Sequence, residues 1–461
     1  MDSLKMCGRL LKSLSLIMKK QARQKRIVRR GIYMLKQNVR NSFNFIDLFA
    51  GAGGLSEGFL QAGFNPVAHV EMNKFAAKTL ETRSAYYYLK DFGKLAVYKK
   101  YMQRKITREE LMKNIPASII KTIINETMSD ETLSSIFKAI DGIMKIRGIG
   151  TIDVIVGGPP CQAYSLVGRA QSSHMKVPME NDPRNYLYKL YARFLKRYQP
   201  RMFVFENVTG IESANGGTTW KNIQKYLKRV GYEIECREQN AHTFGVLQNR
   251  RRMIIVGWLK GSGLKYPDFL EIKTDAVVND LFKDLPALHP GESDNRYAKE
   301  KASRYVIDNG IRTTDDVLTL HNCRPNINRD IKIYRRVVKL WNEGHKRLKY
   351  NDLPEELKTH KNRHSFVDRF KVVEGDEPCC HTILAHISKD GHYFIHPDIK
   401  QNRSITVREV ARIQSFPDSY FFEGPRTSQF VQIGNAVPPM MAKGIAIGIF
   451  EQLYKGVPDG E

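Results

Sequence analysis

Long apolar runs are missing from this chain of 461 residues, and none approaches the roughly 18–20 residues of a membrane-spanning helix. Residues 1–31 carry Lys and Arg through their short apolar patches and have no small-residue cleavage site, so we expect no signal peptide. Cysteine is sparse: six residues without a Cys-x-x-Cys pair argue against a disulfide framework or a zinc site, and we predict no bound metal. A reducing cytoplasm is the expected compartment.

Acidic residues are few beside basic ones, because 48 Asp and Glu stand against 74 Lys and Arg and leave a formal net charge of +26. An excess of this size indicates a polyanionic partner, usually nucleic acid and less often an anionic membrane. A merely basic soluble protein is the alternative, because charge is evidence about partners and not about fold.

The pattern changes along the chain and predicts four segments. Residues 1–42 form a basic extension, either contacting phosphates or solvated. Residues 43–274 form the main domain, with a charged, mostly helical insertion at about 74–148. Residues 275–420 are polar and basic, lose the regular pattern and form a second domain, and residues 421–461 return to the first.

Strand and helix patterns alternate in the main domain, which indicates βαβ units. The expected strands are residues 43–49, 65–71, 154–157, 202–208 and 251–259. The expected helices are residues 54–63, 186–198, 220–231 and, near the end of the chain, 437–456. The predicted fold is therefore α/β, a doubly wound and mostly parallel sheet with a smaller irregular domain.

A glycine-rich turn, FAGAGG at residues 49–54, joins the first strand to the first helix. Its glycines let the backbone approach a ligand, and the helix presents free N–H groups. Glu71 ends the next strand, where an acid typically binds a ribose diol. The turn lacks the Gly-x-Gly-x-x-Gly spacing of a dinucleotide site, so it suits a nucleoside without a pyrophosphate.

The stretch VIVGGPPCQAYS, residues 154–165, ends a strand with a stiff arm and then a thiol. Cys161 thus lies at the carboxyl end of a strand, where open α/β sheets bind ligands. A cysteine is more often a buried small hydrophobe than a nucleophile. However, Gly-Gly-Pro-Pro offers no bulk to bury this one, and the residues after it are polar.

Two further groups would complete a site. Glu206 ends the strand MFVFENV beside Asn207, and an acid there can be held partly desolvated and donate a proton; a helix N-cap region or a surface ion pair is the alternative. Arg250 and Arg252 flank the start of strand MIIVGW, where alternate residues share a face and can point together. A plain basic turn is the alternative.

From Phe45 to about Gly444, outside the variable segment, these motifs in this order resemble the DNA cytosine-5 methyltransferases, in particular bacterial restriction–modification enzymes. FIDLFAGAGGLSEGF resembles the S-adenosylmethionine loop, GGPPCQAYS the nucleophile loop, FENV the proton-donor motif and QNRRR the Gln-x-Arg-x-Arg motif. REVARIQSFPDSY and QIGNAVPP resemble the two closing motifs. Leu247 and Asn249 depart from the family, which often has Pro and Arg there.

The resemblance implies site residues. The implied catalytic residues are Cys161, Glu206, Arg250 and Arg252. The implied cofactor contacts are Phe49, Gly51, Ala52, Gly53, Gly54, Leu55, Glu71, Met72, Pro160, Leu187, Asn435 and Ala436, with Asp130 as the candidate for the acid that contacts adenine. The implied substrate contacts are Gln162, Ser165, Asn207, Gln248 and Thr382.

The resemblance also implies a reaction: methyl transfer from S-adenosylmethionine to C5 of a flipped-out cytosine in a specific duplex DNA site, through a covalent bond between Cys161 and C6. Residues 275–420 would be the target-recognition domain. The expected partners are duplex DNA and a cognate restriction endonuclease without a stable complex, and the expected location is the cytoplasm, on the nucleoid in a bacterium. An RNA cytosine-5 methyltransferase and a catalytically silent paralogue are the alternatives.

Overall fold

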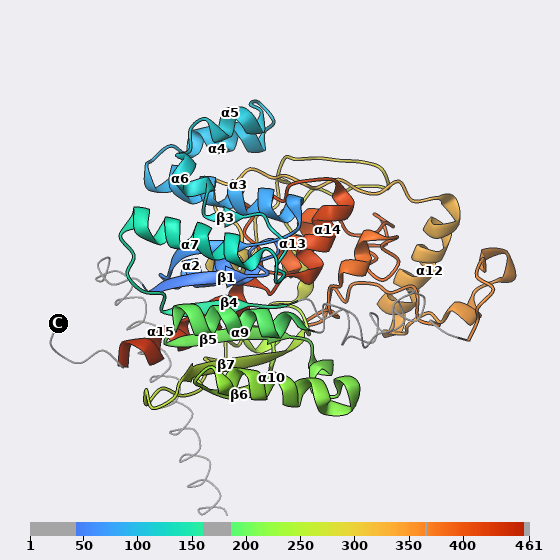
Figure 1. Ribbon diagram of the computed structural model, residues 1–461. Helices are drawn as coiled ribbons and strands as arrows, with labels where there is room; N and C mark the ends of the chain where they lie inside the picture. Colours follow the sequence, from blue (N-terminus) through green and yellow to red (C-terminus); the bar gives the residue numbers. More distant parts are fainter. Residues whose placement is uncertain (1–42, 160–185, 365–366, 456–461) are drawn as a thin grey trace, which may run out of the picture.

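The structure is a computed structural model that describes residues 43–159, 186–364 and 367–455 (Figure 1). Four predicted site residues lie outside the described residues: Pro160, Cys161, Gln162 and Ser165. The basic extension, residues 1–42, also lies outside them.

A seven-stranded sheet in the order β3-β2-β1-β4-β5-β7-β6 forms the centre of the molecule (Figure 1). Its strands are β1 (Asn44–Leu48), β2 (Asn65–Val70), β3 (Ile123–Ile124), β4 (Val154–Gly157), β5 (Met202–Asn207), β6 (Tyr232–Asn240) and β7 (Arg251–Leu259). The first five strands of that order are parallel, whereas β7 runs antiparallel to both β5 and β6. This confirms the predicted doubly wound, mostly parallel sheet. The reversal also brings the start of β7 to the carboxyl ends of the parallel strands.

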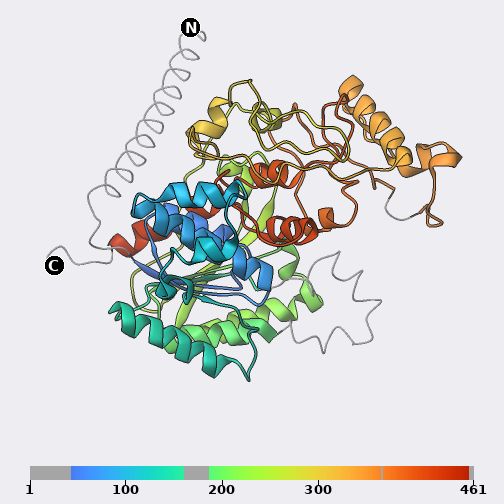
Figure 2. The ribbon, with the colours of Figure 1, turned by 90° about the horizontal axis from the view of Figure 1, so that it is seen from above.

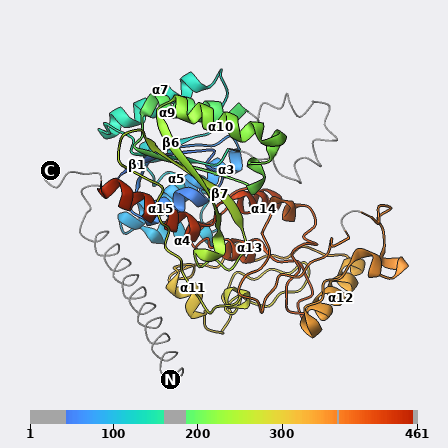
Figure 3. The same cartoon turned by 90° about the horizontal axis from the view of Figure 1, so that it is seen from below.

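Helices cover both faces of the sheet. The α-helices of the described residues are α2 (Gly54–Gln61), α3 (Lys74–Asp91), α4 (Leu95–Met102), α5 (Arg108–Met112), α6 (Ala117–Ile120), α7 (Leu133–Arg147), α9 (Leu187–Tyr198), α10 (Thr218–Arg229), α11 (Arg304–Asp308), α12 (Asn328–Gly344), α13 (Val407–Ile413), α14 (Arg426–Asn435) and α15 (Pro439–Lys455). Figure 3 shows α7, α9 and α10 together on one side of the sheet and α15 on the other. The insertion at 74–148 is mostly helical, as its sequence predicted.

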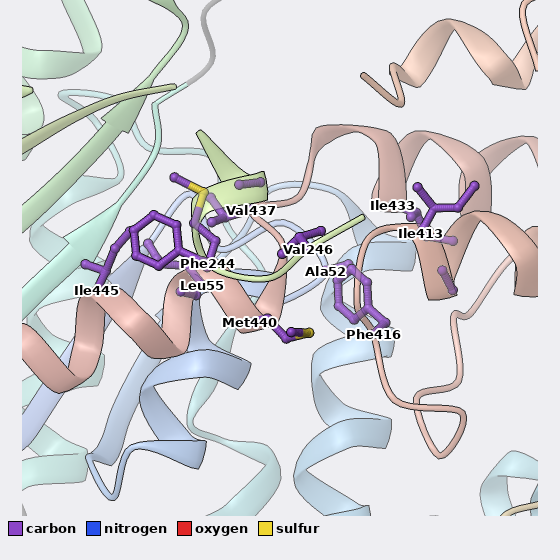
Figure 4. Close-up of a cluster of buried hydrophobic side chains, with 14 of the residues drawn as sticks. Ala52, Leu55, Phe244, Val246, Ile413, Phe416, Ile433, Val437, Met440 and Ile445 are labelled. Atoms are coloured by element: carbon purple, nitrogen blue, oxygen red, sulfur yellow. The ribbon is translucent and has the colours of Figure 1, made fainter. Parts of the chain in front are cut away.

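The core on the α15 face is shared between the two ends of the chain. Side chains of β1, α2 and α15 form one buried cluster with residues from the ranges 278–320 and 373–449. Figure 4 shows part of this cluster, with Leu55 of α2 and Ile445 of α15 among the labelled side chains. A separate cluster surrounds α12, with Ile333, Tyr334 and Trp341 among its members. Figure 2 shows α12 at the end of the molecule away from the sheet. The part of the second segment that has its own core is therefore centred on α12.

By length and composition, the stretch Arg426–Lys455 is apolar enough to cross a membrane. In the folded chain, however, 78% of its apolar window is buried. The stretch contains α14 and α15, which pack against the rest of the protein (Figure 4). Burial of this extent is typical of core helices.

Candidate active site

The turn between β1 and α2 is built for close approach. Gly51 and Gly53 have φ values of 56° and 82°, in the left-handed region that favours glycine. A Cβ on Gly53 would lie 2.7 Å from a side-chain atom of α3, and one on Gly54 would lie 2.2 Å from the carbonyl oxygen of Val437. A Cβ on Gly51 would meet nothing within 4 Å. The turn is thus packed tightly on its inner side and has open space at Gly51.

The other predicted residues of this turn face different ways. Ala52 and Leu55 are buried in the shared core (Figure 4), and the Ala52 carbonyl accepts a hydrogen bond from the Tyr420 hydroxyl. Phe49 has a positive φ of 56° and is partly buried against the opposite face of the sheet. The side chains of Ala52 and Leu55 therefore anchor the turn in the core of the α15 face.

Glu71 follows β2 at the same edge of the sheet. Its carboxylate accepts hydrogen bonds from the Gly51 N–H at 2.8 Å and the Asn73 N–H at 2.7 Å. Asn73 in turn caps α3, because its side chain accepts from the N–H groups of the first helical turn. Burial raises the pKa of Glu71, although the two backbone N–H groups oppose this. The carboxylate is thereby fixed across the glycine turn, while Met72 beside it is exposed.

The carboxyl end of β3 lies next along this edge and is occupied by Asn125. The side-chain amide of Asn125 donates to the Glu71 carbonyl at 2.8 Å. Asp130 lies farther along, where its exposed carboxylate pairs with Arg193 of α9 at 2.5 Å. The structure therefore places Asn125, and not Asp130, beside Glu71. The sequence did not show this because β3 has only two residues, too few for a strand pattern inside a helical insertion.

Two more predicted residues lie at the end of α14. The Cβ of Ala436 is 3.1 Å from the position that a Cβ on Gly54 would take, so this end packs directly on the glycine turn. Asn435 is exposed beside it. Leu187 begins α9 and is partly buried on the other face of the sheet. The sheet and α14 thus bring Gly51, Glu71 and Asn435 to one region.

An acid and a guanidinium group meet at the end of β5, two strands beyond the glycine turn that follows β1. Glu206 of β5 is paired in register with Ile254 of β7, and Arg252 lies two residues before Ile254 on the same face. The Arg252 Nε and the Glu206 Oε1 are 2.9 Å apart, and each side chain is 13% exposed. The antiparallel β7 therefore supplies a cation to an acid that lies at the end of a parallel strand.

The arm after β4 lies beside this pair. A Cβ on Gly158 would be 2.7 Å from the Glu206 Oε2, so only glycine fits there without moving the carboxylate. The buried Asn207 donates from its Nδ2 to the Pro159 carbonyl at 3.4 Å and ties the arm to β5. Pro159 is the last residue described before Cys161. The arm is thus directed past Glu206.

The strand order places this arm between the two halves of the site. β4 pairs with β1 on one side, where Leu48 and Gly157 are in register, and with β5 on the other. A Cβ on Gly157 would be 2.4 Å from the Leu48 carbonyl oxygen, so these strands approach closely. A nucleoside at the glycine turn and a group held by Glu206 and Arg252 would therefore flank the arm.

Arg250 has surroundings quite different from those of Arg252. It is 1% exposed, and its two terminal nitrogens donate to the carbonyls of Ile383 and Gly434. Gln248 is 0% exposed and is hydrogen-bonded inside the protein, and the Thr382 hydroxyl donates to the Asn249 carbonyl at 2.6 Å. The predicted shared direction of the two arginines is not observed, because Arg250 precedes β7 and its chain turns inward.

Metal ligands of protein origin do not gather in the described ranges, where no group of three or more His, Cys, Asp or Glu side chains could hold an ion. The four cysteines that the structure describes, at positions 236, 323, 379 and 380, are free thiols. The described part of the site offers a carboxylate, a guanidinium and backbone groups.

The family described as C-5 cytosine-specific DNA methylase matches residues 43–106 and 112–451. Among characterised proteins, the type II methyltransferase M.Bpa9945I of Bacillus paralicheniformis is 40% identical, over 90% of this chain and 99% of the relative. The type II methyltransferase M1.HphI of Haemophilus parahaemolyticus is 28% identical, over 89% of this chain and 87% of the relative.

A solved structure shares the fold. It belongs to an E. coli protein described as a candidate DNA modification methyltransferase encoded within a prophage. The two chains are 22% identical and superpose with a TM-score of 0.58, over 90% of this chain and 100% of the other.

Proposed function

This chain belongs to the family of C-5 cytosine-specific DNA methylases, and from that premise we propose that it methylates C5 of a flipped-out cytosine in a specific duplex DNA site. The methyl donor is S-adenosylmethionine. The observation that carries the proposal is the Glu206–Arg252 pair beside the arm that leads to Cys161. The net charge of +26 supports a DNA substrate, because such an excess attracts the phosphate backbone.

The residues around the glycine turn fit S-adenosylmethionine. The space at Gly51 is open, and the Glu71 carboxylate is fixed where a ribose diol could donate to it. Asn125, which is bonded to the Glu71 backbone, and the exposed Asn435, which ends α14, offer further polar groups. When bound, S-adenosylmethionine supplies an electrophilic methyl group.

The pair of Glu206 and Arg252 suits the edge of cytosine that carries N3 and O2. Both atoms are hydrogen-bond acceptors, so Arg252 would donate to O2 and a protonated Glu206 to N3. C5 of cytosine is too electron-poor to take a methyl group unaided. Addition of the Cys161 thiolate to C6 breaks the C5–C6 double bond and shifts its electrons through C4 toward N3. Protonation of N3 by Glu206 neutralises the charge that develops there, and the resulting enamine is nucleophilic at C5.

The remaining steps restore the aromatic ring. After C5 has gained the methyl group, a base removes the C5 proton. The electron pair of that C–H bond re-forms the C5–C6 double bond as the Cys161 thiolate leaves, and N3 returns its proton to Glu206. The glycine and proline arm would hold the thiol at one face of the ring, and well-oriented groups of this kind can supply up to about 7–11 kcal/mol.

A base inside a duplex cannot present its face, so the target cytosine has to leave the helix. Residues 275–420 are proposed to read the surrounding sequence, with Thr382 among the substrate contacts. The proposed biological role is the modification arm of a restriction–modification system in the cytoplasm, on the nucleoid if the source is bacterial. A cognate endonuclease would act on the same site without a stable complex.

Whole-genome bisulfite sequencing of a heterologous host that expresses the protein tests the proposal. We expect methylation confined to one short duplex motif and absent with the variant Cys161→Ser. The purified protein should also form a covalent adduct with duplex DNA that carries 5-fluorocytosine, because fluorine at C5 blocks the loss of a proton. Methylation scattered over all cytosines, or a strong preference for folded RNA, would contradict the proposal.

A further inference from the structure

Two buried side chains bind both backbone polar groups of Ile383. The Ile383 N–H donates to the Gln248 Oε1 at 2.9 Å, and the Arg250 Nη1 donates to the Ile383 carbonyl at 2.8 Å. Ile383, Gln248 and Arg250 are each no more than 1% exposed. Residues 248–250 therefore bind both the N–H and the carbonyl of Ile383, which lies more than 130 positions later in the sequence.

The surrounding backbone continues this contact. The Cys380 N–H donates to the Leu247 carbonyl, and the Asn249 N–H donates to the Cys380 carbonyl at 2.8 Å. The Thr382 hydroxyl adds a bond to the Asn249 carbonyl. Residues 247–250 and 380–383 are thus joined by one isolated parallel β-bridge, between Gln248 and Cys380, and by further side-chain hydrogen bonds.

The same two side chains also reach the end of α14. The second terminal nitrogen of Arg250 donates to the Gly434 carbonyl at 3.2 Å. The Gln248 Nε2 donates to the Gln414 Oε1 at 2.8 Å, and Gln414 donates to the carbonyls of Ile433 and Ala436. A Cβ on Gly434 would be 2.4 Å from the Ala385 nitrogen, so the end of α14 lies directly on the segment after Ile383.

Three segments of the proposed site therefore meet at the buried side chains of Gln248, Arg250 and Gln414, which we call the hub. Arg252 follows Arg250 by two residues on β7, Thr382 precedes Ile383, and Asn435 follows Gly434. The polar side chains of the hub are buried, so a partner lost there is not replaced by water and the backbone groups must shift to find another. A shift of Ile383 relative to Gln248 would move Thr382 relative to Arg252.

We propose that Gln248 and Arg250 are positioning residues, which hold the recognition segment 380–385 in register with Arg252 and with the end of α14. They act through Ile383 and do not touch the cytosine. The inference rests on the proposed function, because it assigns Thr382 to recognition, Arg252 to the base and Asn435 to the cofactor. It makes discrimination between DNA sites depend on Gln248 and Arg250.

The variants separate this role from direct contact with cytosine. Arg250→Lys keeps the charge, but one ammonium group replaces the planar fork that reaches two carbonyls. Gln248→Glu keeps the acceptor for the Ile383 N–H and loses the donor to Gln414. Arg251→Ala is the matched control, because Arg251 directly follows Arg250 and its side chain is 63% exposed.

Steady-state methylation of duplexes with the cognate site and with a one-base change is the first measurement. We expect Arg250→Lys to lower the ratio of the two kcat/KM values about tenfold or more, as for the loss of one charged hydrogen bond. The KM for cognate DNA should rise, and kcat should change little. Arg251→Ala should keep the ratio of the wild type. A fall in kcat with unchanged discrimination would overturn the inference and assign Arg250 to the reacting base.

Amide hydrogen exchange gives a readout independent of activity. Exchange in a peptide that spans residues 380–386 should become faster in Gln248→Met, Gln248→Glu and Arg250→Lys, and should keep the wild-type rate in Arg251→Ala. Unchanged exchange in Gln248→Met would overturn the inference, as would faster exchange throughout the sheet, which indicates general destabilisation. A failure of the proposed function is distinguishable, because the wild-type protein itself would then leave cytosine unmethylated.

Discussion

Gly158 shows how a single missing side chain keeps the acid of the site in place. The carboxylate of Glu206 occupies the space that a Cβ at position 158 would need, and Arg252 holds that carboxylate from β7. With glycine at position 158, the arm therefore comes closer to Glu206 and Arg252 than it could with any other residue at that position. Backbone approach, and not flexibility, explains the glycine here, because no positive φ is recorded for Gly158.

Gly158→Ala should displace Glu206 and slow methyl transfer about a hundredfold, since a shift of about 1 Å in a reacting group can cost that much. Single-turnover methylation at saturating DNA and cofactor checks this. Gly150→Ala is the control, because a Cβ there meets nothing within 4 Å and should leave the rate unchanged. A normal rate in Gly158→Ala would show that the position of Glu206 is not critical.

Glu71 makes a second prediction at the residue scale. Glu71→Ala removes the acceptor of the Gly51 N–H and of the proposed ribose diol, and should weaken S-adenosylmethionine binding by about 1–3 kcal/mol in calorimetry. Because burial raises the pKa of Glu71, the wild-type affinity should begin to fall at a higher pH than for an ordinary glutamate as the solution is acidified. Glu71→Gln should abolish that pH dependence. Equal affinities of Glu71→Ala and the wild type would contradict this assignment.

At the scale of elements, buried ion pairs attach α13 to distant residues of the same segment, 275–420. Arg412 donates to Asp284 and Asp418 at 2.6 Å each, and Arg408 also approaches Asp418. Burial by itself would raise the pKa of Asp418, but Arg412 and Arg408 more than reverse this and lower it. The helix therefore depends on charges that water does not screen.

Asp418→Asn should leave two buried guanidinium groups short of a counter-charge and lower the free energy of unfolding by about 3–5 kcal/mol. Urea denaturation followed by circular dichroism measures this. Asp315→Asn is the control, since Asp315 forms an exposed pair with Lys99 and such pairs contribute little. Similar stabilities for the two variants would show that the network around α13 is not a major source of stability.

At the scale of the whole molecule, two buried histidines inside the segment between residues 275 and 420 link the stability of the protein to pH. Burial lowers the pKa of His396 to about 3, with a further contribution from Arg403. Burial also lowers the pKa of His321, which lies against Thr406 and the Pro286 carbonyl. The His396 ring is thus neutral in the folded protein under conditions where an unfolded chain would protonate it, and the lowered pKa of His321 acts in the same direction.

The stability of the protein should therefore depend on pH below about 6.5, the ordinary pKa of histidine. The unfolded chain binds more protons there, so the free energy of unfolding should fall as the pH drops from about 6.5 to 5, by at most about 1.4 kcal/mol per pH unit for each buried ring. Denaturation at several pH values measures the slope. His396→Gln should reduce it, whereas His289→Gln, at an exposed position, should not. A flat profile for the wild type would contradict the prediction.

The sequence alone determined the features that depend on local pattern. Apolar runs and amphipathic spacing indicated β1, α2, β2, β4 and β5 because burial on one or both faces leaves a period in the chain. The strand patterns put the glycine turn, Glu71 and Glu206 at strand ends. Ligands bind at the carboxyl ends of parallel strands, which lie along one edge of the sheet, so these residues were predicted to belong to one site. Strand β6 was not predicted, since it is a charged edge strand with a single fully buried residue.

Tertiary structure alone decided which distant groups share a partner. Arg250 and Arg252 are indistinguishable in the sequence, yet one binds buried carbonyls and the other binds Glu206. Residues near 280 and 410 were separated from the main domain by their polar pattern, but the fold uses their arginines and carboxylates inside a common core. The physical reason is that a polar side chain becomes a core residue only when the fold brings its counter-charge or carbonyl to it.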